Sequence, residues 1–454
     1  MELQNKKVTV VGAGISGIAA VDLLTGAGAI VTLYDGNQDL SENEVRAKLC
    51  PAFCGSFVFG EFSEELKKNT EILVMSPGVP VDLPFVEELK SAGVPVIGEI
   101  ELAYLFSKGK IVAVTGTNGK TTTTALTGEI MRTYYENVLV VGNIGTPYTS
   151  LVKTTDDAAV TVAEISSFQL ETVESFRPDV SMILNITPDH LNRHHTMDNY
   201  IAAKEAIAAN QTAQDVCILN YEDEVLRAFG EQVKSRVLYF SSVRNLEEGL
   251  YVEDDIIFYA HEGIAEYIIK VDELNIIGKH NHENAMAAIG AGIMMGVPLD
   301  LIQKALREFK AVEHRVEYVA TKRGVKYYND SKGTNPDAAI QAIRAMKGNT
   351  LLIGGGYDKG NEYDEWIEAF EGKVGYFVLI GQTKEKIAEA AKRLGVENVV
   401  LCDTFLEAME FCTAHANPGD TVLLSPACAS WGMFKNYEER GHIFKDYVRG
   451  LSEE

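Results

Sequence analysis

The strongest constraint on the fold is a pattern that recurs along most of the chain: a short β-branched run leads through a glycine turn into an amphipathic helix. Strands that alternate with helices in this way predict an α/β fold with mostly parallel sheets. The clearest predicted strands are Lys7–Val11, Ile30–Tyr34, Ile72–Met75, Ile111–Thr115, Val138–Val141, Ala158–Glu164, Val180–Leu184, Thr350–Ile353, Tyr376–Ile380, Asn398–Leu401 and Thr421–Leu424.

Interruptions in this pattern predict the domain boundaries. We place one near Gly98, before the predicted helix Glu99–Phe106, and one near 311–314, after the predicted helix Leu299–Phe309. At roughly 100–200 residues per domain, a chain of 454 residues has room for about three domains. We therefore expect domains at 1–98, 99–311 and 312–454.

Composition excludes several classes of protein. The formal net charge of -24 argues against a nucleic-acid backbone as partner, because proteins that bind one usually carry a basic face. The longest apolar runs are far shorter than the roughly 20 residues that span a bilayer, and the first residues do not read as a signal peptide. We expect a cytoplasmic monomer with neither nucleic acid nor membrane as partner. Its six cysteines, of which only Cys50 and Cys54 are close in sequence, predict plain buried thiols rather than disulfides or zinc ligands.

A first glycine motif, Gly12-Ala-Gly14-Ile-Ser-Gly17, lies between a predicted strand and a predicted helix, and Asp35 ends the next strand. Glycines there let a backbone approach a pyrophosphate at the helix N-terminus, and an acid in the position of Asp35 can accept ribose hydroxyls. The motif fits NAD, FAD or another nucleotide diphosphate, and a purely structural tight turn is the alternative. Ser76-Pro-Gly78 is either a second turn facing the same crevice or an ordinary loop.

A second glycine motif, Thr115-Gly-Thr-Asn-Gly-Lys120-Thr-Thr122, also stands between a strand and a helix. It departs from the usual P-loop form, because position 114 is Val and the first glycine is Gly116. The backbone N–H groups of such a loop cradle phosphates, its lysine reaches the β/γ oxygens and the following hydroxyl can ligate magnesium. We predict a nucleoside triphosphate site in a central P-loop ATPase domain, flanked by Rossmann-like N-terminal and C-terminal domains.

Several further motifs support a family resemblance. The 115–122 loop is similar to that of the Mur ligases and the folylpolyglutamate synthases, which join an amino acid to a carboxylate with ATP. The remaining motifs resemble those of the Mur ligases, and the last three resemble those of members that add D-glutamate: Glu164–Gln169, Asn185–His190, Tyr200–Lys204, Gly278–Asn284, His314-Arg315, Asn329–Asn335, Ser425–Ser430 and Phe434–Gly441.

The resemblance implies ATP and Mg²⁺ as cofactors, and UDP-N-acetylmuramoyl-L-alanine and D-glutamate as substrates. ATP would phosphorylate the terminal carboxylate, and the D-glutamate amine would attack the acyl phosphate through a tetrahedral intermediate, releasing ADP and phosphate. A folylpolyglutamate-synthase-like ligase is an alternative, which the N-terminal glycine motif disfavours. An NAD-dependent dehydrogenase is another, which the 115–122 loop disfavours, and a binding module without chemistry stays open.

Two of the expected catalytic residues rest on different kinds of support. Glu164 ends a predicted strand at the carboxyl edge of the sheet and is the best magnesium ligand, with a helix cap or surface charge as the alternative. Lys204 reads from sequence as a solvated helix lysine, but the resemblance implies a carbamoylated lysine that helps hold magnesium. The expected catalytic residues are Lys120, Glu164, His190, Lys204 and Lys332, and the expected metal ligands are Thr121, Glu164, His190 and carbamoylated Lys204.

The remaining expected contacts follow from the resemblance, position by position. For ATP they are Gly116, Thr117, Asn118, Gly119, Lys120, Thr121, Thr122, Asn281, Asn284, Arg315 and Asp330, with a turn residue as the rival interpretation of Asp330. For the UDP substrate they are Ile15, Ser16, Asp35, Gly36, Ser76, Asn143, Gln169 and His190. For D-glutamate they are Thr334, Lys359, Ser430 and Tyr437. The loop around Lys359 differs in spacing from the family's loop, Tyr437 stands where the family often has Phe, and His194 and His195 are given no role.

Overall fold

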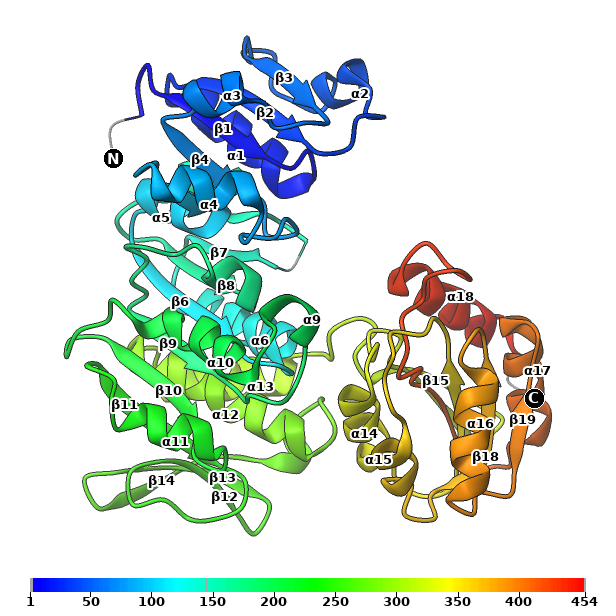
Figure 1. Cartoon of the computed structure of the whole chain (residues 1–454). Coiled ribbons are helices and arrows are strands. Elements are labelled where there is room, and N and C mark those ends of the chain that lie inside the picture. Colours follow the sequence, from blue (N-terminus) through cyan, green and yellow to red (C-terminus); the bar gives the residue numbers. More distant parts are fainter. Residues whose placement is uncertain (1–2, 144, 453–454) are drawn as a thin grey trace. The chain divides into compact units, whose positions relative to one another are not determined.

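The computed structural model describes residues 3–143 and 145–452, which form two compact units (Figure 1). The first contains Met1–Glu273 and Glu283–Arg307, and the second contains Leu274–His282 and Glu308–Glu454. The described part contains no helix with the length and apolar character needed to cross a membrane.

The first unit begins with a five-stranded parallel sheet in the order β3-β2-β1-β4-β5. Its strands are β1 (Lys7–Val11), β2 (Ile30–Asp35), β3 (Ser56–Phe59), β4 (Ile72–Met75) and β5 (Val96–Gly98), and its helices are α1 (Ile15–Gly26), α2 (Glu42–Arg46), α3 (Glu64–Lys68) and α4 (Pro84–Ser91). The strand order reverses between β1 and β4, which is where Rossmann-like sheets bind nucleotides.

A nine-stranded sheet follows in the same unit, in the order β14-β13-β12-β11-β10-β9-β6-β8-β7. Its strands are β6 (Lys110–Thr115), β7 (Val138–Gly142), β8 (Val160–Glu164), β9 (Val180–Ile183), β10 (Val216–Asn220), β11 (Arg236–Ser241), β12 (Gly249–Glu253), β13 (Ile256–His261) and β14 (Ile264–Lys270). Strands β6–β12 pair in parallel, and β13 and β14 extend the sheet antiparallel.

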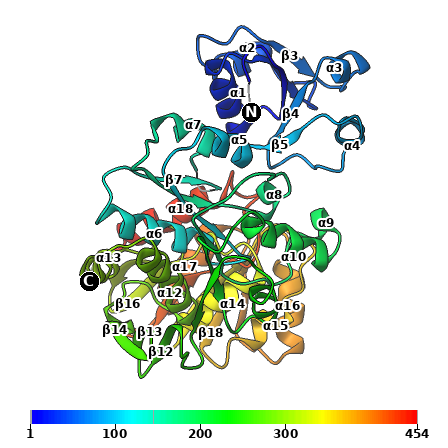
Figure 2. The same ribbon diagram turned by 90° about the vertical axis from the view of Figure 1, so that its left-hand side faces the viewer.

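The α-helices along this segment are α5 (Glu99–Phe106), α6 (Lys120–Arg132), α7 (Tyr148–Leu151), α8 (Ser167–Leu170), α9 (Leu191–His194), α10 (Met197–Glu205), α11 (Glu224–Gly230), α12 (Lys279–Met294) and α13 (Leu299–Glu308). Helix α5 packs against both α1 and α7, so it links the layers around the two sheets of this unit (Figure 2). One continuous apolar core runs from β1 and α1 through α5 to β6, β8 and β10.

The second unit is built on a six-stranded sheet in the order β15-β16-β20-β17-β18-β19, parallel except for the β15–β16 pair. Its elements are β15 (Glu317–Lys322), β16 (Val325–Asn329), α14 (Pro336–Ala345), β17 (Thr350–Gly355), α15 (Asp364–Glu368), β18 (Val374–Ile380), α16 (Lys384–Arg393), β19 (Val399–Leu401), α17 (Phe405–His415), β20 (Thr421–Leu424) and α18 (Tyr437–Gly450). Alternate strand residues face opposite sides: Leu352 packs with α14–α16, whereas Leu351 and Ile353 pack with α17 and α18.

The predicted α/β fold class, with three mostly parallel sheets, is confirmed. All eleven predicted strands exist, with ends that differ by at most two residues. The domain limits at 98 and 311 stay predictions. The prediction of buried thiols is wrong at two positions, because Cys50 is only half-buried and Cys54 is exposed, although all six cysteines are free.

Candidate functional site

The carboxyl ends of three neighbouring strands define the candidate site of the first unit. Strands β9, β6 and β8 are adjacent and parallel, and they end at Ile183, Thr115 and Glu164. The phosphate loop, the Glu164 carboxylate and the segment that leads to His190 therefore leave the sheet at one edge. In α/β proteins this edge is where ligands bind.

The phosphate loop depends on two glycines with left-handed backbone. Gly116 has φ 146° and Gly119 has φ 88°. A Cβ on Gly119 would lie 2.2 Å from Oδ1 of Asn284, so the close approach of Asn284 also demands a glycine there. The loop leads directly into α6, whose N-terminal N–H groups face the side on which an anion would lie.

Hydrogen bonds hold the phosphate loop against the segment after β9. The amide N–H of Asn118 donates to Oδ1 of Asn185 at 2.8 Å, and the amide N–H of Thr117 donates to the Asn185 carbonyl at 2.9 Å. The Thr117 hydroxyl donates to the Thr187 carbonyl at 3.0 Å. Asn185 and Thr187 thus fix the shape of the loop, although sequence reasoning gave them no role beyond the motif.

Lys120 and Lys204 meet inside this loop. The ammonium of Lys120 donates to the carbonyl oxygens of Gly116 and Thr117, each at 2.8 Å. The amine of Lys204 donates to the same Gly116 oxygen at 2.8 Å and lies 4.6 Å from the centre of the Tyr200 ring. Lys204 is only 1% exposed, so its interpretation as a solvated side chain is wrong.

The pKa of Lys204 is lowered well below its ordinary value. Burial is the main cause, and the nearby positive charge of Lys120 adds to it. Burial disfavours the charged form of an amine. The amine beside the phosphate loop should therefore lose its proton more readily than that of an exposed lysine.

Glu164 presents a buried carboxylate at the end of β8. It is 2% exposed, and its Oε1 accepts a hydrogen bond from the Asn143 amide at 2.8 Å. Its Oε2 is buried and has no hydrogen-bond partner among residues 3–143 and 145–452. An orphaned carboxylate oxygen is costly unless a cation or donor satisfies it, so the site fits a magnesium ion. Thr121 is buried in the first turn of α6, and its hydroxyl is a second oxygen of the kind that magnesium prefers.

His190 is the N-cap residue directly before the four-residue helix α9 and has a left-handed backbone, φ 54°. Its Nε2 lies 3.6 Å from Oδ2 of Asp189, and its ring lies 4.8 Å from that of Phe168. The side chain is 47% exposed. The ring is therefore not part of a buried core.

Residues near His190 form a cluster that the sequence did not reveal. His194 is buried, with Nε2 at 2.9 Å from the Ser167 hydroxyl and Nδ1 at 3.3 Å from Oε1 of Glu171. Burial, helped by the charges of His190 and Arg193, lowers the pKa of His194 to about 4. Glu171 also pairs with Arg193 at 2.6 Å. No spacing in the sequence signals this arrangement.

The first glycine motif forms a tight turn at the start of α1. Gly12 has φ 98°, and a Cβ on Gly17 would lie 1.8 Å from the Gly12 carbonyl oxygen. The Asp35 carboxylate accepts the amide N–H of Ala13 at 2.8 Å and so supports the turn. The Ser76 hydroxyl donates to the Gly12 carbonyl at 3.4 Å, so the turns after β1 and β4 lie together.

The other residues expected at the UDP substrate lie in different surroundings. Ile15 is 74% exposed and Gly36 is exposed, both beside the turn. Gln169 is buried, and its side-chain oxygen accepts from the amide and the hydroxyl of Ser166 in a capping box. Ser16 is half-buried in the first turn of α1.

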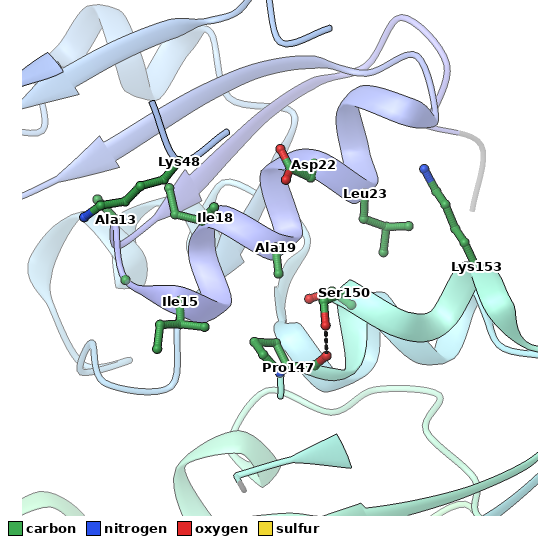
Figure 3. A pocket seen from close by; sticks show the side chains of 12 residues that line it. Ala13, Ile15, Ile18, Ala19, Asp22, Leu23, Lys48, Pro147, Ser150 and Lys153 are labelled. Carbon is green, nitrogen blue, oxygen red and sulfur yellow. Dashed lines mark hydrogen bonds between the residues drawn. The ribbon is translucent and has the colours of Figure 1, made fainter. Parts of the chain in front are cut away.

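A pocket of about 580 Å³ opens beside this turn, between α1 and α7 (Figure 3). Figure 3 shows the Lys48 side chain running past Ile18 toward Ala13, with Lys153 at the other end near Leu23. Neither ammonium group has a hydrogen bond or ion pair within the part of the chain that the structure describes. The pocket is lined by Ala13, Gly14, Ile15, Ile18, Ala19, Asp22, Leu23, Lys48, Pro147, Thr149, Ser150 and Lys153.

In the second unit, the loop after β16 carries Asp330, one of the residues expected at ATP. Asp330 is 2% exposed, and its carboxylate accepts the Ser425 hydroxyl at 2.8 Å and the Val316 amide at 3.3 Å. Burial raises the pKa of Asp330 to about 6, against the opposing effect of Arg315. Asn281 is also buried, and its amide donates to the Ile277 carbonyl at 2.7 Å.

The buried guanidinium of Arg440 ties two loops of this unit together. It donates to the hydroxyl and carbonyl of Ser331, at 3.0 and 2.8 Å, and to the carbonyl of Cys428 at 3.2 Å. The Ser331 hydroxyl in turn donates to the Tyr437 carbonyl at 2.8 Å. The sequence placed Arg440 in a motif but gave it no role.

The expected D-glutamate residues fall into two groups. The Lys332 ammonium lies 5.4 Å from the centre of the Tyr437 ring, and Thr334 follows in the same loop. The Lys359 ammonium lies 5.6 Å from the centre of the Trp431 ring, next to the buried Ser430. The structure thus brings the loop of Lys359 together with the segment of Ser430 in spite of the unusual spacing, since Tyr357 and Ala429 also form a β-bridge.

Comparisons with known proteins agree along the whole chain. Residues 6–98 match the Mur ligase MurD-like N-terminal domain, residues 114–292 the Mur ligase middle domain, and residues 314–428 the Mur ligase glutamate ligase domain. A UDP-N-acetylmuramoylalanine--D-glutamate ligase of Lachnoclostridium phytofermentans is 61% identical over 454 residues, which is 100% of both chains. One of Lachnospira eligens is 55% identical, over 99% of this chain and 100% of the other.

Solved structures support the same fold at low sequence identity. MurF from Acinetobacter baumannii has a TM-score of 0.62 and 18% identity, and covers 97% of this chain and 93% of its own. UDP-N-acetylmuramate-alanine ligase MurC from Thermotoga maritima has a TM-score of 0.60 and 18% identity, and covers 98% of this chain and 99% of its own.

Proposed function

The chain belongs to the Mur ligase family, and on that premise we propose that it uses ATP to join D-glutamate to UDP-N-acetylmuramoyl-L-alanine. The full-length relatives that carry this activity in their names support both substrates. The observation that carries the chemistry is the sheet edge where the phosphate loop, two lysines and the orphaned oxygen of Glu164 meet. We further propose that the enzyme works as a monomer in the cytoplasm.

The reaction needs an activated carboxylate. An oxygen of the alanyl carboxylate attacks the γ-phosphorus of ATP, and the bond to the β,γ-bridging oxygen breaks, which gives an acyl phosphate and ADP. The D-glutamate amine then attacks the acyl carbon to form a tetrahedral intermediate. Loss of phosphate and of the amine proton leaves the amide.

The first step brings anions together, so the site must supply positive charge. Lys120 would shift from its own loop to the transferring phosphoryl group, and the N–H groups of the loop and of α6 would hold the β-phosphate. Thr121, Glu164, His190 and carbamoylated Lys204 would hold Mg²⁺. When bound, that ion offsets the negative charge on the phosphate oxygens.

Lys204 is suited to become a carbamate. Its lowered pKa eases loss of the ammonium proton, and the resulting amine nitrogen attacks the carbon of CO₂ to form an N–C bond and then loses a second proton. The product is an anion in place of the amine. That change puts a negative charge near the Lys120 side chain and adds a ligand for a metal.

The UDP substrate and D-glutamate would bind to two different sets of residues. The UDP diphosphate would lie on the turn at Gly14–Ser16, with the Lys48 ammonium as its cation and Asp35, Gly36 and Ser76 around the uridine end. Asn143, Gln169 and His190 would contact the muramoyl-alanyl arm. Thr334, Lys359, Ser430 and Tyr437 would bind D-glutamate, and Lys332 would lie near the reacting phosphate.

ATP would use the phosphate loop and further residues that the family resemblance implies. Thr117, Asn118, Gly119 and Thr122 shape or line the loop, and Asn281, Asn284, Arg315 and Asp330 are the proposed contacts to the rest of the nucleotide. The relatives give no support to the folylpolyglutamate and dehydrogenase alternatives.

The test is phosphate release with ATP, Mg²⁺ and a panel of acceptors and amino acids. UDP-N-acetylmuramoyl-L-alanine with D-glutamate should be used best. D-glutamine should be on the order of 10²-fold lower in kcat/KM, because a pocket built to pair a charged group rejects analogues that lack it. L-glutamate and meso-diaminopimelate, which carry two carboxylates in another configuration or at another spacing, should also be poor substrates. A better rate with diaminopimelate, or with a UDP-muramoyl-alanyl-glutamate acceptor, would contradict the proposal.

A further inference from the structure

A chain of side-chain contacts in the first unit connects the turn after β4 with the ring of His190. One terminal nitrogen of Arg193 donates both to Oε2 of Glu171, at 2.6 Å, and to the carbonyl oxygen of Val79, at 3.0 Å. Val79 directly follows the Ser76–Gly78 turn, whose serine touches the Gly12 carbonyl. Arg193 therefore has a bond to the segment expected to hold the UDP end of the substrate.

The same guanidinium lies against the side chain that supports His190. Its carbon is 4.9 Å from the centre of the Phe168 ring. The Phe168 ring lies 4.8 Å from the His190 ring on one side and 5.5 Å from the His194 ring on the other. A movement of Arg193 would therefore change the position of the Phe168 ring, and through it the position of the His190 ring.

Glu171 is the second member of this arrangement. Its carboxylate pairs with Arg193 through Oε2 and lies 3.3 Å from Nδ1 of His194 through Oε1. The side chains of Arg193 and Glu171 are 11% and 13% exposed, so water competes little for their pairing. Glu171 thus connects Arg193 with His194, which both pack against Phe168.

The backbone here needs such support. Helix α9 has only four residues, and the residues on both sides of it, His190 and His195, have positive φ values of 54° and 66°. Left-handed backbone is unfavourable for residues other than glycine and persists where the surroundings enforce it. The contacts of Arg193 are a means of enforcing it.

We propose that Arg193 and Glu171 are positioning residues that couple occupation of the turn after β4 to the placement of His190. Binding of the uridine diphosphate end would fix the Ser76–Val79 turn, which fixes Arg193 through the Val79 carbonyl. Arg193 in turn fixes Phe168 and the His190 ring. The kinetic part of this inference rests on the proposed function, whereas the binding part does not.

The kinetic test compares Arg193→Met, Arg193→Lys and Glu171→Gln with Arg132→Met. Arg132 is the matched control, because it pairs with Glu129 three residues away on the exposed face of α6. Arg193→Met should lower kcat/KM for the UDP substrate about 10–100-fold, with a lower kcat and a higher KM. Small misplacements at a reacting centre have effects of that order. The KM values for ATP and D-glutamate should stay within about twofold of wild type, and Arg193→Lys should recover part of the loss.

The binding test follows the His190 ring by nuclear magnetic resonance, with His190→Gln to assign the signal. Addition of UDP alone should shift the His190 ring signals in wild type and in Arg132→Met, and should shift them much less in Arg193→Met. An unchanged UDP-induced shift in Arg193→Met, or equal losses in Arg193→Met and Arg132→Met, would overturn the inference. If Arg193→Met fails to fold, Arg193→Lys and Glu171→Gln decide by the same two measurements. An inactive wild type that still shows the UDP-induced shift would reject the proposed function and leave the coupling in place.

Discussion

Lys120 and Lys204 both donate to the carbonyl oxygen of Gly116, each at 2.8 Å. Two lysine side chains on one oxygen repel each other when both are charged, and the lowered pKa of Lys204 is partly a result of that repulsion. The arrangement separates their roles. We assign Lys120 to the phosphate and Lys204, whose lowered pKa eases loss of its proton, to modification.

Replacement of Lys204 by alanine should nearly abolish ligase activity, because the site would lose the carbamate that helps hold magnesium. Removal of CO₂ should lower wild-type activity, and bicarbonate should restore it. The neutral fraction of the amine grows as pH rises through its lowered pKa, so reactivation by CO₂ should extend to lower pH than for an exposed lysine. A short carboxylate salt should partly rescue Lys204→Ala. Crystal density for a bare amine at full occupancy, with metal bound at neutral pH, would contradict carbamoylation.

Replacement of Lys120 by alanine should reduce turnover by about 10²–10³-fold or more, since single charge contacts to a transferring phosphoryl group have effects of this size. The assay is phosphate release at saturating ATP. Lys110→Ala, at the exposed start of β6, is the control and should stay close to wild type. Retention of more than roughly a tenth of wild-type turnover by Lys120→Ala would be incompatible with the assigned role.

Replacement of Lys48 by glutamine should raise KM for the UDP substrate by about 3–10-fold, the range expected when one partly solvated charge contact to an anion is lost. Lys153→Gln is the control, because Lys153 lines the same pocket at the end away from the glycine turn. The KM for ATP should not change in either variant. Equal effects of the two substitutions would show that Lys48 acts only through the general charge of the pocket.

Asp330 should make the second unit less stable as pH rises. Its pKa is about 6 in the folded chain and about 4 when unfolded, so the folded state binds more protons between those values. The contribution is fully present below the unfolded pKa and is lost as pH rises through about 6. Wild type should lose on the order of 1–3 kcal/mol of unfolding free energy between about pH 4 and 7 that Asp330→Asn does not lose. Denaturant titrations of both proteins across that range measure the difference, and parallel curves would refute it.

Eleven parallel strands were predictable because a buried strand of a parallel sheet reads as an apolar run before a glycine turn. The parallel strands β3, β5, β10 and β11 were not among them. The hairpins β12–β13, β13–β14 and β15–β16 were not predicted. Their two-residue turns have positive φ at both positions, at Asp254–Asp255, Glu262–Gly263 and Arg323–Gly324. Such turns are usually recognised by Asn-Gly or Asp-Gly, and none of the three carries that pair.

The candidate site was predictable where a strand end fixes a position, as at Glu164. It was not predictable where burial depends on distant packing. Lys204 lies on a helix of low apolar content, and only the folded chain shows that this helix turns its lysine toward Gly116. His194 and Glu171 are joined across 23 positions by contacts that no spacing reveals.

The guanidinium of Arg440 has a consequence for the order in which the protein matures. Its acceptors, on Ser331 and Cys428, belong to loops that are synthesised earlier, while Arg440 itself lies in α18, the last helix of the chain. During translation the phosphate loop can therefore form long before Arg440 makes the hydrogen bonds that connect the loops around Lys332 and Ser430. A nascent chain stalled before α18 would be expected to bind nucleotide at the phosphate loop while its amino-acid-binding site is still disordered.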